Sequence, residues 1–290
     1  MTGHLFSFGH GYSSSALAAR LVPQGWRITG TTREAHNADA IRASGVTPVI
    51  VPDQDIAPAL REATHLLVCA APDENGDPML ARYQDLLTEA APHLTWVGYL
   101  STTGVYGDHG GDWVDEDTAL SPATRRGQMR VEAENAWTAF CAANTLPLSI
   151  FRLAGIYGPG RGPFAKVRAG TARRIIKDGQ VFSRTHVEDI AQVLEAAINR
   201  PQCSGIFNVC DDDPAPPQDV IAYAAELLGL PLPEAVDFET AELSPMARSF
   251  YAESKKVRND RIKNDLGVRL LYPDYKTGLE ALLKAEENAG

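Results

Sequence analysis

Cysteine, positive charge and long apolar runs are all scarce in this sequence, and each scarcity excludes a class of protein. The four cysteines, Cys69, Cys141, Cys203 and Cys210, form no C-x-x-C pair and have no histidines at zinc spacing. Neither a disulfide framework nor a metal site is therefore predicted. Acidic residues outnumber basic ones by 37 to 27, and the net charge of −10 disfavours general affinity for nucleic acid or an anionic membrane.

No apolar run approaches the roughly 20 residues that a membrane-spanning helix requires, and no basic-then-apolar leader opens the sequence. We expect a cytoplasmic protein that binds a small-molecule substrate and has no nucleic-acid or membrane partner. The length of 290 residues suits one α/β domain with an appended lobe, and a cleft between the two.

Short apolar runs alternate with helical patterns through the first half of the chain, which is typical of a doubly wound parallel sheet. The expected strands after the first, Leu5 to Phe8, are 27–31, 46–51, 66–70, 96–100 and 148–153. The clearest expected helices cover 16–21, 59–62, 79–90 and 130–143. A ligand of such a sheet is expected at the carboxyl ends of its strands.

The pattern changes after residue 153, where Gly and Pro become frequent and a basic segment follows at 166–177. Thr185 and Glu188 have capping-box spacing before a helix to Asn199, and 205–210 predicts a late strand that returns to the sheet. Further helices are expected at 219–228 and 275–286. We therefore assign 1–155, completed by about 185–210, to the sheet domain, and 156–184 with 211–290 to a substrate-binding lobe.

A glycine turn joins the first strand to the first helix. Gly9 suits a tight bend, and the missing side chain at Gly11 would let a pyrophosphate reach the free N–H groups of the helix start, around Tyr12 and Ser13. The third glycine of G-x-G-x-x-G is replaced by Ser14, which is still small enough for close helix packing. An ordinary βα loop is the alternative, but strand, turn and helix follow in the order that dinucleotide binding requires.

Four further motifs coincide with this turn. They are L-S-T-T-G-V-Y-G at 100–107, R-L-A-G-I-Y-G-P-G at 152–160, H-V-E-D at 186–189 and F-N-V at 207–209. Over nearly the full length, the chain resembles extended short-chain dehydrogenases/reductases of the NAD(P)-dependent epimerase/dehydratase group. The resemblance implies a Rossmann domain for NAD or NADP, a smaller C-terminal lobe for a substrate that is often a nucleotide sugar, and a possible homodimer.

The departures from that group concern catalysis. The resemblance places Arg126 and Arg130 where active members carry the tyrosine and lysine of Tyr-x-x-x-Lys. A guanidinium stays protonated and cannot replace the phenol as acid and base, although Arg130 could hydrogen-bond a ribose. Thr102 matches the hydroxyl that polarises the reacting oxygen, whereas Thr103 and Gly104 stand where a dehydratase has Asp and Glu. The chain thus resembles the atypical, YeeZ-like branch of the group.

Two further positions bear on the cofactor. Arg33 follows the second strand, where a cation favours the 2′-phosphate of NADP, although a solvated Arg33 with Glu34 turned inward would suit NAD. Ala70 and Ala71 end the fourth strand, and their small side chains would let the adenosine lie close to the backbone. The alternative is that they are simply the start of a loop.

The remaining candidates have structural alternatives. The resemblance places Tyr157 near the nicotinamide, as a catalytic or substrate contact. The alternative is structural, with the adjoining Gly-Pro-Gly segment redirecting the chain between the two lobes. His186 and Asp189 are expected mainly to fix a helix start. The basic cluster at 161–174 could meet a substrate phosphate, or form a solvated face.

The sequence therefore predicts an NADP-preferring oxidoreductase or epimerase-like protein, with NAD possible and no metal. Its substrate would be a small carbonyl or carbinol compound, such as a nucleotide sugar or a phosphorylated one. The alternative is a catalytically degenerate NAD(P)-binding sensor, which the replacement of both Tyr and Lys favours.

Overall fold

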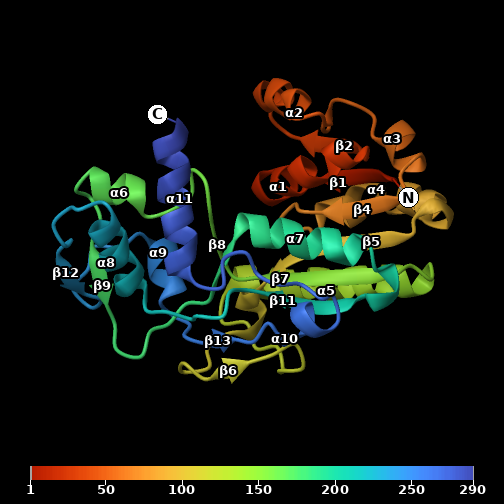
Figure 1. Cartoon of the computed structure of the whole chain (residues 1–290). Coiled ribbons are helices and arrows are strands. Elements are labelled where there is room, and N and C mark those ends of the chain that lie inside the picture. The colour runs from red at the N-terminus through yellow and green to blue at the C-terminus, as the bar shows by residue number, and fades with distance from the viewer. Residues whose placement is uncertain (1, 290) are drawn as a thin grey trace.

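A computed structural model describes residues 2–289 as a parallel sheet between two helical layers, with a smaller lobe beside the carboxyl ends of the strands (Figure 1). The seven strands are all parallel. In spatial order they are β11 (Gly205–Val209), β7 (Leu148–Leu153), β5 (Trp96–Thr102), β4 (His65–Val68), β1 (His4–Phe8), β2 (Arg27–Thr32) and β3 (Thr47–Ile50). The sheet confirms the predicted Rossmann-type α/β fold, and its order reverses between β1 and β4, where dinucleotides bind in such folds.

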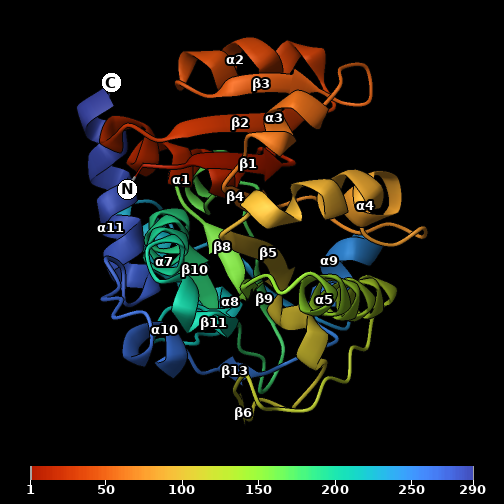
Figure 2. The same ribbon diagram turned by 90° about the vertical axis from the view of Figure 1, so that its right-hand side faces the viewer.

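Helices cover both faces of the sheet, as the view along its edge shows (Figure 2). One layer contains α1 (Tyr12–Leu21), α2 (Ala38–Ala43) and α7 (Val187–Ile198); the other contains α3 (Ala57–Arg61), α4 (Pro78–Ala90) and α5 (Arg125–Ala143). Every residue of β1 is buried, as expected of a strand covered on both faces. Its polar His4 is satisfied by the Thr29 hydroxyl at 2.8 Å. Short 3-10 turns are η1 (Val22–Gln24), η2 (Ala35–Asn37), η3 (Ala91–His93), η4 (Thr103–Tyr106) and η5 (Pro201–Cys203).

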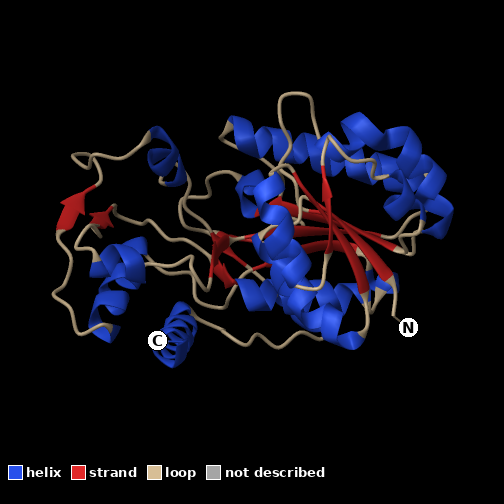
Figure 3. Ribbon diagram, turned by 90° about the horizontal axis from the view of Figure 1, so that it is seen from above, coloured by secondary structure: helices blue, strands red, loops and turns tan. Residues whose placement is uncertain are grey.

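The lobe lies beside the sheet in Figure 3 and has its own small core. Its elements are β8 (Gly155–Tyr157), α6 (Phe164–Arg168), β9 (Arg174–Ile176), β10 (Arg184–His186), α8 (Pro217–Leu227), β12 (Ala235–Asp237), α9 (Pro245–Phe250) and α11 (Tyr275–Ala289). Between α9 and α11 the chain returns to the sheet side: β13 (Lys256–Val257) pairs with β6 (Trp113–Val114), and α10 (Asp260–Asn264) buries Ile262 beneath the α1 and α7 layer. The proposed domain boundaries stay a prediction.

One local expectation was wrong. The helix α7 is capped by His186 and not by Thr185, because the His186 Nδ1 accepts from the N–H of Glu188 at 3.2 Å. Asp189 instead fixes the C-terminal segment, since its carboxylate accepts from the N–H groups of Leu271 and Tyr272 at 2.7 and 3.1 Å. The carboxylate of Asp189 therefore ties α7 to the stretch before α11.

Candidate functional site

The glycine turn between β1 and α1 forms an open cradle. Gly9 has φ +81°, and a Cβ there would lie 2.9 Å from the backbone nitrogen of Ala70, so this position accepts only glycine. Gly11 is extended, at φ −135° and ψ −150°, and a Cβ there would meet nothing nearer than the Gly9 carbonyl oxygen at 3.8 Å. The absence of a side chain at Gly11 is thus not needed by the fold, and it leaves space free in front of α1.

That space is lined by unsatisfied donors at the start of α1. Among residues 2–289, no acceptor takes the N–H of Tyr12 or of Ser13. Ser14 is only 2% exposed, and its Oγ accepts from the Gly11 N–H at 2.8 Å and donates to the Gly11 carbonyl at 3.1 Å. Ser14 therefore closes the turn locally in place of a third glycine, and the two free N–H groups suit an anion.

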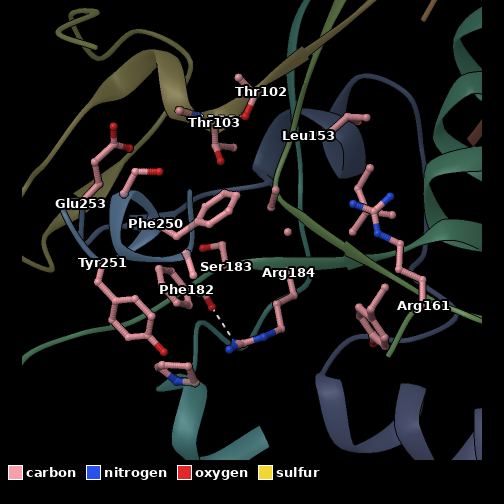
Figure 4. A pocket seen from close by; sticks show the side chains of 18 of the residues that line it. Thr102, Thr103, Leu153, Arg161, Phe182, Ser183, Arg184, Phe250, Tyr251 and Glu253 are labelled. Atoms are coloured by element: carbon pink, nitrogen blue, oxygen red, sulfur yellow. Dashed lines mark hydrogen bonds between the residues drawn. The ribbon is translucent and has the colours of Figure 1, made fainter. Parts of the chain in front are cut away.

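A cavity of about 1520 Å³ extends from this cradle into the lobe (Figure 4). Its lining contains most of the residues that the sequence predicted for the site: Gly9, Gly11, Tyr12, Ser13, Ser14, Ala71, Thr102, Arg130 and Tyr157. Ala70 and Arg33 do not line it. Ala70 packs against Gly9, and Arg33 is exposed just beyond β2.

Arg33 has no acidic partner within 4.0 Å in the part of the chain that the structure describes. The carboxylate of the neighbouring Glu34 lies 3.9 Å from the His36 ring. The backbone N–H of Glu34 donates to the Thr32 hydroxyl at 3.2 Å. Arg33 is thus a cation without a counterion beside the β2 end of the site.

Thr102 ends β5 at the wall of the cavity, where Figure 4 shows it next to Thr103. Its Oγ1 accepts from the N–H of Gly104 at 3.1 Å and so caps η4. Because this bond uses the hydroxyl as an acceptor, its proton stays free to be donated to a ligand oxygen.

The first two turns of α5 place Arg126 and Arg130 in the lining. Arg130 Nη1 donates to the Leu100 carbonyl at 2.7 Å and to the Tyr99 hydroxyl at 3.0 Å, which fixes the guanidinium against β5. Arg126 lies 5.7 Å from the centre of the Phe250 ring, across the cavity from α5. Burial raises the pKa of Tyr99 to about 12, so the phenol beside Arg130 is a poor proton source at neutral pH.

Tyr157 lines the cavity, and its hydroxyl packs against the start of α11. It donates to the Asp274 carbonyl at 3.4 Å, and α11 approaches so closely that a Cβ on Gly278 would lie 2.0 Å from the oxygen. Burial, with Asp211, Asp189 and Asp274 nearby, raises the pKa of Tyr157 far above its usual range. This geometry favours packing over proton transfer, and the catalytic role stays an untested prediction.

The sequence patterns missed two parts of the lining. Lys255 is buried and donates to the Gly107 carbonyl at 2.7 Å and to the Glu253 carboxylate at 2.6 Å. Arg184 donates to the carbonyls of Phe182 and Ala215 at 2.8 and 2.9 Å, the first of which is the dashed line in Figure 4, and burial lowers its pKa. The sequence carried no signal for either residue, because neither belongs to a quoted motif and both are flanked by polar residues.

A buried ion pair lies behind the end of β5 that carries Thr102. Arg152 Nη2 lies 2.8 Å from the Glu134 carboxylate, both side chains are at most 4% exposed, and Ser101 donates to the same carboxylate at 2.5 Å. Arg152 also donates to the Tyr106 hydroxyl at 2.9 Å. This network joins β5, β7 and α5 and so fixes the position of Thr102.

Within residues 2–289, no three or more His, Cys, Asp or Glu side chains are grouped as a metal site would require. No helix there is long and apolar enough to span a membrane. All four cysteines are free thiols.

Known proteins resemble this chain in sequence and in fold. A family model described as the NAD dependent epimerase/dehydratase family matches residues 9–210. Protein YeeZ of Escherichia coli (strain K12) is 31% identical over 283 residues, covering 92% of this chain and 95% of that protein.

Two solved structures extend the comparison. A functionally unknown conserved protein from Silicibacter pomeroyi DSS is 61% identical with a TM-score of 0.94, covering 98% of this chain and 99% of that one. UDP-glucuronic acid 4-epimerase from Bacillus cereus, in complex with UDP-glucuronic acid and NAD, is 18% identical with a TM-score of 0.79, covering 99% and 100%. At that identity the second likeness shows the fold alone.

Proposed function

The chain belongs to the NAD dependent epimerase/dehydratase family, and from this premise we propose that it is an NADP-preferring oxidoreductase or epimerase-like protein. One observation carries the proposal: the open cradle at Gly11, with the free N–H groups of Tyr12 and Ser13, belongs to the same cavity as Thr102. An extended dinucleotide with its pyrophosphate at α1 and its nicotinamide near Thr102 fits that arrangement.

The preference for NADP rests on Arg33. Its guanidinium has no acidic partner among residues 2–289 and lies just beyond β2, where the ribose 2′ position falls in such folds. A guanidinium binds a phosphate with two parallel hydrogen bonds. NADPH is therefore expected to bind more tightly than NADH, and Arg33→Ala is expected to weaken only NADPH, by about 1 to 3 kcal/mol. Equal affinities in the unaltered protein, measured by calorimetry, would reject the preference.

When bound, a nicotinamide supplies or accepts a hydride, and the chain must do the rest. Thr102 would donate a hydrogen bond to the oxygen on the reacting carbon, and the N–H groups of Tyr12 and Ser13 would hold the pyrophosphate. Arg130 donates to the Leu100 carbonyl, and in this proposal it would also hydrogen-bond the ribose. A guanidinium is not an acid or base near neutral pH, so we assign proton transfer to water or to the substrate's own groups.

The proposed substrate is a small carbonyl or carbinol compound bearing phosphate, a nucleotide sugar included. Three cations line the cavity and support an anionic substrate: Lys166 and Arg184 from the lobe, and Arg126 from α5. Neither Arg126 nor Lys166 has an acidic partner within 4.0 Å among the described residues.

A catalytically degenerate NAD(P)-binding sensor is the second candidate, favoured by the two arginines at the Tyr-Lys positions. Nucleotide sugars and phosphorylated carbonyl compounds should be screened with NADPH absorbance and product analysis, so that redox-neutral epimerisation is also detected. For an enzyme, Thr102→Val should lower turnover by roughly 10² or more, because it removes the donor that stabilises an oxyanion. Intact NADPH binding with no turnover across the screen would favour the sensor.

The proposal also includes a cellular location and an oligomeric state. The free thiols fit a reducing cytoplasm. A homodimer through α4 and α5 is the expected assembly, and sedimentation of the full chain tests it.

A further inference from the structure

The loop after β8 packs against the glycine turn from the opposite side of the cavity. The Tyr12 hydroxyl donates to the Pro159 carbonyl at 2.9 Å, and a Cβ on Gly158 would lie 2.6 Å from that hydroxyl. Gly158 and Arg161 exchange two backbone hydrogen bonds of 2.9 Å, which close the loop into a turn. The backbone of Arg161 is thus fixed relative to the first residue of α1, although the two are 149 positions apart in sequence.

The Arg161 guanidinium is held over the Tyr12 ring, 5.8 Å from its centre. Arg161 lines the cavity together with Gly9, Gly11 and Ser13, and Figure 4 shows its side chain extending beside Leu153. No carboxylate lies within 4.0 Å of it among residues 2–289, whereas the nearby Arg168 is paired with Glu286 at 2.6 Å. A cation without a counterion therefore faces the cradle whose other wall is the start of α1.

We propose that Arg161 binds the pyrophosphate of the dinucleotide from the lobe side, so that the cofactor is held between α1 and the 158–161 turn. This inference rests on the proposed dinucleotide binding. The N–H groups of Tyr12 and Ser13 carry only partial charge, and the guanidinium supplies the full positive charge that a doubly negative pyrophosphate lacks there. Tyr12 is the positioning residue, because its ring supports the guanidinium and its hydroxyl anchors the loop. The cofactor then joins the lobe to the sheet domain.

The test is a calorimetric titration of the full chain with NADPH and with NADH. Arg161→Ala should weaken both nucleotides by the same factor, about 10- to 100-fold, because the pyrophosphate is common to both. The loss should shrink as salt is raised, and Arg161→Lys should recover part of the affinity. Arg168→Ala is the matched control, since it removes the same side chain seven residues away without changing the cavity lining, and circular dichroism checks that each variant is folded.

The outcomes separate this inference from the proposed function. If the unaltered chain binds the nucleotides and Arg161→Ala binds them with the same affinity, the inference alone is overturned. A loss confined to NADPH also overturns it, because the guanidinium would then contact the 2′-phosphate. Failure of the unaltered chain to bind either nucleotide overturns the proposed function together with the inference.

Discussion

Gly11→Val should abolish dinucleotide binding and leave the fold intact. At φ −135° the backbone of Gly11 accepts any L-residue, and its Cβ would meet nothing closer than 3.8 Å, so the fold has no steric need for glycine there. The valine methyl groups would instead occupy the space in front of the Tyr12 and Ser13 N–H groups. Two charge-assisted hydrogen bonds of about 1.5 to 3 kcal/mol each would be lost, which corresponds to an affinity loss of at least about 100-fold.

The assay pairs calorimetric titration of NADPH with thermal unfolding followed by circular dichroism. Gly9→Val is the contrasting variant: its positive φ and the 2.9 Å approach to the Ala70 nitrogen predict a destabilised fold. A folded Gly11→Val protein with undiminished affinity for NADPH would refute the reasoning, because the pyrophosphate would then lie elsewhere.

Three further variants test the packing that supports the site. Burial lowers the pKa of His10 to about 4, and because the unfolded chain binds that proton near pH 6.5, stability should fall as pH drops from 6.5 toward 4, by at most about 1.4 kcal/mol per unit. His10→Asn should show a shallower fall in urea unfolding over that range, and an unchanged slope would contradict the assignment. Gly278→Ala should lower the free energy of unfolding by about 1 to 3 kcal/mol, because the new methyl group clashes with the Tyr157 hydroxyl. Adding Tyr157→Phe to that variant should restore part of the lost melting temperature. If it restores none, the strain lies elsewhere. Glu134→Gln should lower the free energy of unfolding by about 3 to 5 kcal/mol, because it leaves the Arg152 charge buried without its anionic partner. A loss below about 1 kcal/mol in denaturant unfolding would show that the ion pair is dispensable.

The parallel sheet was predictable because each strand is a short run rich in apolar or β-branched residues between helical patterns. The glycine turn was predictable for the same local reason, since Gly9, Gly11 and the small Ser14 are adjacent in sequence. The structure adds which glycine serves which purpose: Gly9 is required by the approach of Ala70, a contact across 61 positions that no local pattern carries.

Some features of the site depend on contacts between residues far apart in the chain, and these could not be predicted from the sequence. The direction of the Tyr157 hydroxyl is set by α11, more than a hundred residues later. Lys255 and Glu253 reach the cavity only because the chain returns to the sheet side at β13 and bonds to Gly107. The sequence offered both Thr185 and His186 for the start of α7, and the His186 ring nitrogen is the one that caps it.

The central claim is that the cavity holds a nicotinamide dinucleotide with its pyrophosphate at α1 and its nicotinamide beside Thr102. A crystal structure of the full chain with NADP tests it most directly. The account predicts the pyrophosphate against the Tyr12 and Ser13 N–H groups, the Arg161 guanidinium within hydrogen-bond distance of it, and Thr102 beside the nicotinamide. A dinucleotide bound outside the cradle, or a cavity that stays empty at saturating NADP, would contradict the account.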